Sequence, residues 1–147
     1  MAATESQLQE QVASYIARKY PRVMFHSDFG SGVKLTPQQA VRQKRQNAGR
    51  RAWPDLFIAE SSNRCVDGSW DFEWHGLFIE LKREGSRLKK KNGEYYSQHI
   101  AEQAAVLDQL EEKGYFARFA VGFEEAKKLI DDYLGGLIDE DHESSVF

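Results

Sequence analysis

The chain has 147 residues and a formal net charge of −3, a length that suits one domain with a single hydrophobic core. Its one cysteine, Cys65, excludes an internal disulfide and a thiolate metal cluster, and no run of about 18 apolar residues is present to span a membrane. We therefore expect neither a disulfide-rich secreted protein nor a membrane protein, and we expect a location in the cytoplasm.

The N-terminal segment predicts a helix that starts after Thr4, a favourable N-cap, and ends before Pro21. Its apolar residues recur at helical spacing, namely Leu8, Val12 and Ile16. The stretch RVMFH that follows predicts a short strand over residues 22–26. A helix followed by a strand is thus the expected start of the domain.

A basic helix is predicted next, with Thr36 as its cap, Pro37 at its first position and Gly49 after its end. No acid occurs between Asp28 and Asp55, where six basic residues occur: Lys34, Arg42, Lys44, Arg45, Arg50 and Arg51. A second basic block, KREGSRLKKK, covers residues 82–91. Such local blocks can attract phosphate even though the whole chain is acidic, and a merely solvated face is the alternative for each.

The second half of the chain predicts two strands, over residues 55–59 and 70–82, joined by a turn-rich segment. A long amphipathic helix over 97–114, stopped by Gly114, a strand over 115–121 and a last helix over 123–134 follow. This order predicts an α/β fold with a central mixed β-sheet flanked by helices. We expect one domain over residues 1–134 and an acidic, flexible tail over 135–147.

Three aromatic residues alternate within the predicted strand over 70–82 and therefore share one of its faces: Trp70, Phe72 and Trp74. Packing in the core is one interpretation of this face. An exposed face of this kind would instead stack nucleic-acid bases or form a contact between subunits. Both interpretations remain open at this point.

The same predicted strand ends in a charged pair, in the sequence GLFIELK. Side chains two apart on a strand point the same way, so Glu80 and Lys82 share a face and look into one cleft. Burying two charges costs several kcal/mol for each ion unless they find partners. Asp55, at the start of the preceding strand and just after Pro54, can converge on Glu80 if the two strands pair. Two carboxylates of this kind suit Mg²⁺, which prefers oxygen ligands together with water and substrate phosphate.

The two motifs, PD at residues 54–55 and ELK at residues 80–82, resemble those of the PD-(D/E)xK nuclease superfamily. The order of elements and the downstream sequence EQAAVLDQLEEKG resemble more specifically its VRR-NUC branch, in which a helix glutamine precedes a leucine and then a glycine. Here these residues are Gln103, Leu110 and Gly114. The resemblance extends from about Glu5 to about Leu134, and it implies a restriction-endonuclease-like core.

The resemblance also implies roles for individual residues. Asp55 and Glu80 would be metal ligands, Lys82 would orient the attacking water or stabilise the transition state, and Gln103 would support the site. The family uses a glutamate of its first helix as well, and here Glu5 and Glu10 compete. Glu5 falls on the apolar stripe of its helix, about 140° away from Glu10, so Glu5 is the expected third ligand.

The implied function is a Mg²⁺-dependent DNA endonuclease, with Mn²⁺ as a substitute, that acts on branched or junction DNA in replication, repair or recombination, in host cytoplasm if phage-encoded. A non-catalytic nucleic-acid-binding or assembly protein is the alternative. Basic residues would hold DNA phosphates, namely Arg42, Lys44, Arg45, Arg50, Arg51, Lys89, Lys90 and Lys91. One metal site cuts one strand at a time, so we expect a homodimer that presents two equivalent sites to a junction.

Overall fold

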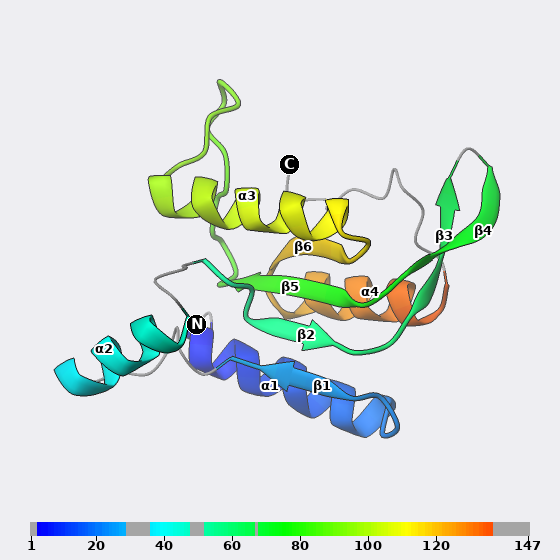
Figure 1. Ribbon diagram of the computed structural model, residues 1–147, viewed down its shortest axis with the longest axis horizontal. Helices are drawn as coiled ribbons and strands as arrows, with labels where there is room; N and C mark the ends of the chain where they lie inside the picture. The colour runs from blue at the N-terminus through cyan, green and yellow to red at the C-terminus, as the bar shows by residue number, and fades with distance from the viewer. Residues whose placement is uncertain (1–2, 29–35, 48–51, 67, 137–147) are drawn as a thin grey trace.

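The computed structural model describes residues 3–28, 36–47, 52–66 and 68–136. Its centre is a four-stranded sheet in the order β1-β2-β5-β6, formed by β1 (Phe25–Ser27), β2 (Leu56–Ile58), β5 (Leu77–Lys82) and β6 (Phe116–Val121) (Figure 1). β2 is antiparallel to both of its neighbours, β1 and β5, whereas β5 and β6 are parallel. The sheet is therefore mixed, which confirms the fold class expected from the sequence. The predicted strand over 22–26 is found one to three residues later, at β1.

Helices cover both faces of this sheet. One face packs against α1 (Glu5–Lys19) and α4 (Phe123–Leu134), and the other packs against α3 (Gln98–Glu112). The predicted N-caps are confirmed, because the hydroxyls of Thr4 and Thr36 each accept a hydrogen bond from the backbone N–H three residues later. Thr36 starts α2 (Pro37–Gln46), which stands apart from the sheet (Figure 1). None of the ten residues of α2 is buried.

Alternation along β5 divides the interior into two cores. Leu77, Ile79 and Leu81 lie in the core shared with α1 and α4, whereas Phe78 lies in the core shared with α3. Successive side chains of a strand point to opposite faces of a sheet. The α3 face of β5 therefore also carries Glu80 and Lys82, as the spacing of the charged pair predicts.

The prediction of one continuous strand over residues 70–82 is wrong. Residues 69–74 form β4 (Ser69–Trp74), which pairs with β3 (Ser62–Val66) in a separate two-stranded sheet, and the sequence did not reveal β3. The break falls at Gly76, where a Cβ would lie 2.8 Å from the ring of Phe57 and 3.0 Å from the carbonyl oxygen of Ile58. Close packing of backbone against β2 thus ends one strand and begins the next.

Trp74 is a core residue. Its ring packs edge to face on Phe116, with centroids 5.2 Å apart, and the residue is buried. The side chains of Trp70 and Phe72 lie outside the described part of the structure. Trp74 is therefore not part of an exposed subunit contact. The homodimer remains a prediction. The predicted acidic tail also lies outside the described residues from 137 onward.

A partly buried cluster of polar side chains around Asp131 links α1 to α4. Asp131 accepts hydrogen bonds from the hydroxyls of Tyr15 (2.6 Å) and Tyr20 (2.7 Å), and the Nζ of Lys19 lies 3.2 Å from its Oδ1. Burial acts to raise the pKa of Asp131, but the hydrogen bonds from these three partners outweigh it and lower that pKa below its ordinary value. The cluster therefore favours the ionised carboxyl.

We expect Asp131→Asn to lower the free energy of unfolding by about 1–3 kcal/mol at pH 7. A carboxyl whose pKa falls on folding stabilises the fold above its unfolded pKa of about 3.9, and this contribution is lost as the pH falls through the folded pKa. The difference between the two proteins should therefore shrink below about pH 4, as measured by urea unfolding. Asp132→Asn is the control, because Asp132 pairs with the exposed Lys128. Equal losses in both variants would contradict the prediction.

Candidate active site

The two carboxylates predicted to converge lie side by side across β2 and β5. The antiparallel register pairs Leu56 with Ile79, so the next pair outward is Asp55 with Glu80. The backbone N–H of Leu81 donates a hydrogen bond of 2.9 Å to Oδ2 of Asp55. Asp55 and Glu80 are only 5% and 4% exposed. Strand pairing therefore brings residues from the PD and ELK motifs, 25 positions apart in the chain, into one buried site.

Two polar side chains approach Glu80 on this face of the sheet. Nε2 of Gln103, on α3, donates a hydrogen bond of 2.7 Å to Oε1 of Glu80. Nζ of Lys82 lies 3.9 Å from the same oxygen, and the side chain of Lys82 is 13% exposed. The helix glutamine and the strand lysine, which are far apart in sequence, therefore both contact the same carboxyl group.

The electrostatics of the site work against two ionised carboxylates. Burial is the largest cause that raises the pKa of Glu80, to about 9, and the neighbouring charge of Asp55 adds to it. The positive charge of Lys82 acts in the opposite direction. Like charges close together in a buried place are stable only if a proton or a cation is added. A site of this kind has a need for positive charge that Lys82 alone does not meet.

The donor set fits a hard divalent cation. Oε2 of Glu80 and Oε1 of Gln103 are buried and have no hydrogen-bond partner within the described residues. A cation bound here would take the place of the proton that the raised pKa of Glu80 favours, and Oε2 would then be an anionic ligand. Among the residues that the structure describes, no group of three His, Cys, Asp or Glu side chains is arranged to hold a metal. The protein thus offers two carboxylates, Asp55 and Glu80. This number suits Mg²⁺, which keeps several waters and binds through one or two carboxylates plus substrate phosphate.

Of the two acids competing on α1, Glu5 is the one near the site. Nε of Arg83, which follows β5, donates a hydrogen bond of 3.3 Å to the carbonyl of Ala3 and so ties the start of α1 to the end of β5. The charge of Glu5 contributes to raising the pKa of Glu80. Because Glu5 is not in a metal-holding group with Asp55 and Glu80, its role as a ligand stays a prediction.

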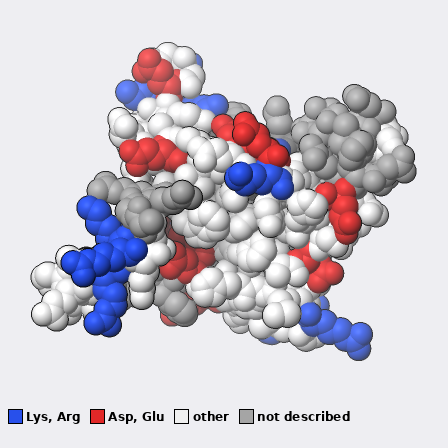
Figure 2. Space-filling view, in the orientation of Figure 1, with Lys and Arg blue, Asp and Glu red and all other residues white. Residues whose placement is uncertain are grey.

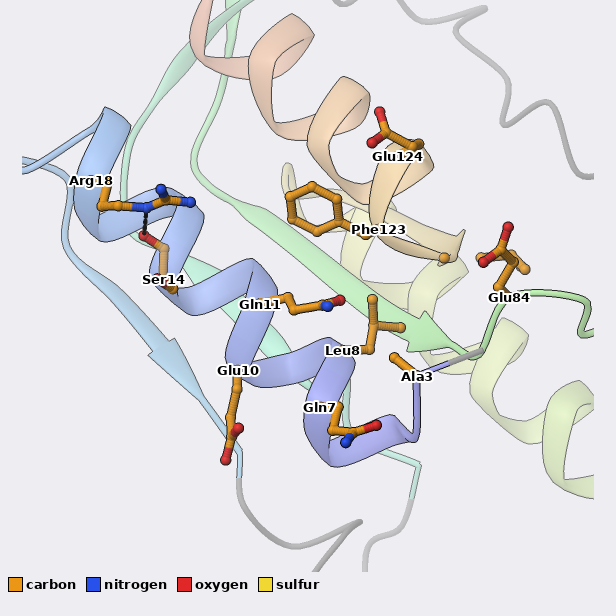
Figure 3. A pocket seen from close by; sticks show the side chains of 12 residues that line it. Ala3, Gln7, Leu8, Glu10, Gln11, Ser14, Arg18, Glu84, Phe123 and Glu124 are labelled. Carbon is orange, nitrogen blue, oxygen red and sulfur yellow. Dashed lines mark hydrogen bonds between the residues drawn. The ribbon is translucent and has the colours of Figure 1, made fainter. Parts of the chain in front are cut away.

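Glu10 belongs to a different part of the molecule. It lines a hollow of about 1020 Å³ between α1 and the start of α4, together with Gln7, Gln11 and Glu124. Figure 3 shows the Glu10 side chain pointing away from Phe123 and α4. The hollow contains none of the predicted catalytic residues, so it is not the candidate active site.

The basic residues proposed from the sequence lie on two separate elements. Arg42, Lys44 and Arg45 are exposed on α2, and Figure 2 shows blue side chains gathered over that helix. Lys89, Lys90 and Lys91 are exposed on the loop between β5 and α3, where Lys89 lies over the ring of Tyr95. In Figure 1 the end of β5 lies between α2 and this loop. Arg50 and Arg51 lie outside the described residues.

Sequence reasoning did not single out Trp53, which lies beside the site. This residue is 58% exposed, and its ring packs edge to face on Phe78 with centroids 5.2 Å apart. Trp53 precedes the PD motif directly, so its position next to a predicted ligand was the signal available in the sequence. The residue before it, Ala52, has a φ of 64°, in the left-handed region that favours glycine.

Comparison with known proteins bears on the fold. No protein-family model and no curated protein matches the sequence. A solved structure described as a "VRR_NUC domain protein" superposes on the chain with a TM-score of 0.61, covers 95% of both chains and is 21% identical in sequence. The chain has the fold of a VRR-NUC domain. The resemblance seen in the motifs is thereby confirmed at the level of the fold, over almost the whole chain. No helix in the described part of this VRR-NUC fold is long and apolar enough to cross a membrane.

Proposed function

We propose that the protein is a metal-dependent endonuclease that hydrolyses phosphodiester bonds in DNA. The observation that carries the proposal is the buried pair of carboxylates, Asp55 and Glu80, on paired strands with Lys82 and Gln103 around them. A pair of buried like charges costs stability, and a purely structural site has no need of it. The VRR-NUC fold supports the proposal, because the chain has the fold that the resemblance of its motifs implies.

Each residue has a separate task in this proposal. Asp55 and Glu80 would hold Mg²⁺, with Mn²⁺ as a substitute, and Gln103 orients Glu80 through its hydrogen bond. When bound, the ion supplies positive charge that polarises the scissile phosphate and lowers the pKa of an attacking water. Lys82 brings a fixed positive charge to the same place, where it can stabilise the charge that develops on the phosphate. Glu5 would complete the acidic side of the site.

The test is cleavage of labelled linear duplex, single-stranded and four-way-junction DNA by the purified protein with Mg²⁺, Mn²⁺ or EDTA. We expect cleavage of at least one substrate with either metal and none in EDTA. The junction substrate tests the expected selectivity for branched DNA. Metal-independent binding without cleavage of any substrate would overturn the proposal in favour of a non-catalytic DNA-binding protein.

We further propose that α2 holds the DNA backbone through Arg42, Lys44 and Arg45. Each neutralised phosphate contributes about −0.9 to the slope of log affinity against log salt on duplex DNA, so replacing all three by Ala should flatten this slope by about two to three units. Binding is measured in EDTA by fluorescence anisotropy over a range of KCl concentrations. None of the three side chains is buried, so the fold should tolerate the change.

The control for this prediction removes the same charge elsewhere, by replacing Arg22, Lys113 and Lys128, which are also exposed, with Ala. It separates local phosphate contacts from the overall loss of positive charge. Equal changes in slope for the two triple variants would mean that α2 does not touch DNA.

A further inference from the structure

Trp53 is an exposed aromatic side chain at the rim of the candidate active site. A solitary exposed apolar residue is ordinary on a protein surface, so exposure alone indicates nothing. Trp53 differs in its position. It lies two residues before Asp55, and its ring rests on Phe78, which lies two residues before Glu80 on the same face of β5. The indole is therefore linked to both carboxylates: Trp53 is two residues from Asp55, and its ring contacts Phe78, two residues from Glu80.

The orientation of the Trp53 ring is fixed by its contact with Phe78 and by the restricted backbone of its neighbours in the chain. Phe78, on which it rests, is stacked on Phe57 with centroids 4.5 Å apart and contacts the ring of Tyr115 at 5.3 Å. Pro54 follows Trp53 and restricts its backbone to extended conformations. Ala52 precedes it in a left-handed conformation that costs about 1–2 kcal/mol for a residue with a Cβ. Such strain is kept where the surrounding structure requires a particular path.

A fixed aromatic face suits a flat, apolar partner, and the surrounding charge indicates which one. The loop that directly follows β5 carries the exposed Lys89, Lys90 and Lys91, so a polyanion is the favoured occupant. Bases stack on aromatic side chains whatever their sequence, because every base has a π-face. In a continuous duplex, however, each base is already stacked on its neighbours. Only an unpaired base can offer a free face to the indole.

We propose that Trp53 stacks against an unpaired base next to the phosphate that is cut, and that the substrate class is DNA with single-stranded nucleotides at the cleavage point. This inference rests on the proposed nuclease function, whose substrate it specifies. Trp53 acts here as a residue that positions the strand and selects for unpaired DNA. It takes no part in the chemical step.

The experiment compares the wild type with Trp53→Phe, which keeps a stacking ring, and Trp53→Leu, which keeps only apolar bulk. The probe is 2-aminopurine placed at successive positions of a single-stranded arm joined to a duplex, with the fully paired duplex as the reference. Binding is measured in EDTA, so the result does not depend on cleavage. A stacked 2-aminopurine loses fluorescence, which a merely structural residue would not cause.

We expect one or two probe positions in the unpaired arm to be quenched by the wild type and by Trp53→Phe, but not by Trp53→Leu. Affinity of Trp53→Leu for the arm should fall roughly 5- to 150-fold, with little change for the duplex. Thermal unfolding of each variant checks the fold. If the wild type quenches the fluorescence of 2-aminopurine at no position, that result alone overturns the inference.

Two further results would also overturn the inference. One is an equal loss of affinity by Trp53→Leu for paired and unpaired DNA. The other is a change in molecular mass of Trp53→Leu by light scattering, which would assign Trp53 to a contact between two copies of the chain.

If the protein stacks unpaired bases but cuts no DNA with Mg²⁺ or Mn²⁺, the nuclease proposal fails while the stacking itself stands. If it cuts DNA and Trp53→Leu binds like the wild type, the nuclease proposal stands alone.

Discussion

Glu80→Gln should abolish DNA cleavage while leaving DNA binding in EDTA intact. Gln has nearly the shape of Glu and can still accept the hydrogen bond from Nε2 of Gln103, so the packing between β5 and α3 is retained. The oxygen Oε2, which is buried without a hydrogen-bond partner in the described residues, is replaced by an amide group that cannot ionise to bind a metal. A metal contributes several kcal/mol of transition-state stabilisation, so we expect the rate of cleavage to fall roughly 1000-fold or more.

A second measurement tests the metal site without any catalysis. A ligand that binds only the folded state raises the unfolding temperature, so Mg²⁺ should stabilise the wild type against heat and should fail to stabilise Glu80→Gln. Without metal, the variant should be at least as stable as the wild type, because burial makes the ionised Glu80 unfavourable.

Glu10→Gln is the matched control for Glu80→Gln. It removes one carboxylate from α1, at the hollow between α1 and α4, which contains none of the predicted catalytic residues. It should leave both cleavage and metal stabilisation unchanged. A Glu80→Gln protein that cuts at the wild-type rate would place the active site elsewhere. Loss of activity in Glu10→Gln alone would instead reverse our choice between the two acids of the first helix.

The parts of this fold that sequence predicted are those that depend on local chemistry. Thr4 and Thr36 cap their helices because a hydroxyl three residues before a free backbone N–H satisfies it, whatever the tertiary structure. The common face of Glu80 and Lys82 follows from the period of a strand. The period of a helix likewise puts Glu5 and Glu10 on different faces of α1, and only Glu5 is among the charges that act on the pKa of Glu80.

The parts that sequence did not predict depend on contacts between distant residues. The break between β4 and β5 is set by Phe57, which packs against Gly76 from a different strand, and by Gly114, whose carbonyl accepts a hydrogen bond from the backbone N–H of His75. Periodicity along residues 70–82 carries no information about either partner. The position of α2 could not be predicted either, because α2 makes too little contact with the rest of the domain. It buries none of its residues, so no apolar face indicates where it docks.

Lys82→Ala should slow cleavage roughly 100- to 1000-fold, the usual cost of losing one group that stabilises charge in a transition state. Its ammonium lies 3.9 Å from Oε1 of Glu80 and is largely shielded from water, so its charge is felt strongly within the site. If Lys82 acts mainly on the reacting phosphate, stabilisation of the folded protein by Mg²⁺ should persist in the variant. This pattern differs from that of Glu80→Gln, in which both properties are lost.

The alternative role for Lys82 is a structural counter-charge for the two carboxylates, since its positive charge acts to lower the pKa of Glu80. In that case Lys82→Ala should lower the stability of the metal-free protein, because the carboxylates lose their counter-charge, and excess Mg²⁺ should restore the rate by supplying that charge. Lys128→Ala is the control, because it removes an exposed lysine that pairs with Asp132 on the same helix, α4. A rate that stays low at saturating Mg²⁺ assigns Lys82 to the transition state. An unchanged rate at every Mg²⁺ concentration would remove Lys82 from the catalytic set altogether.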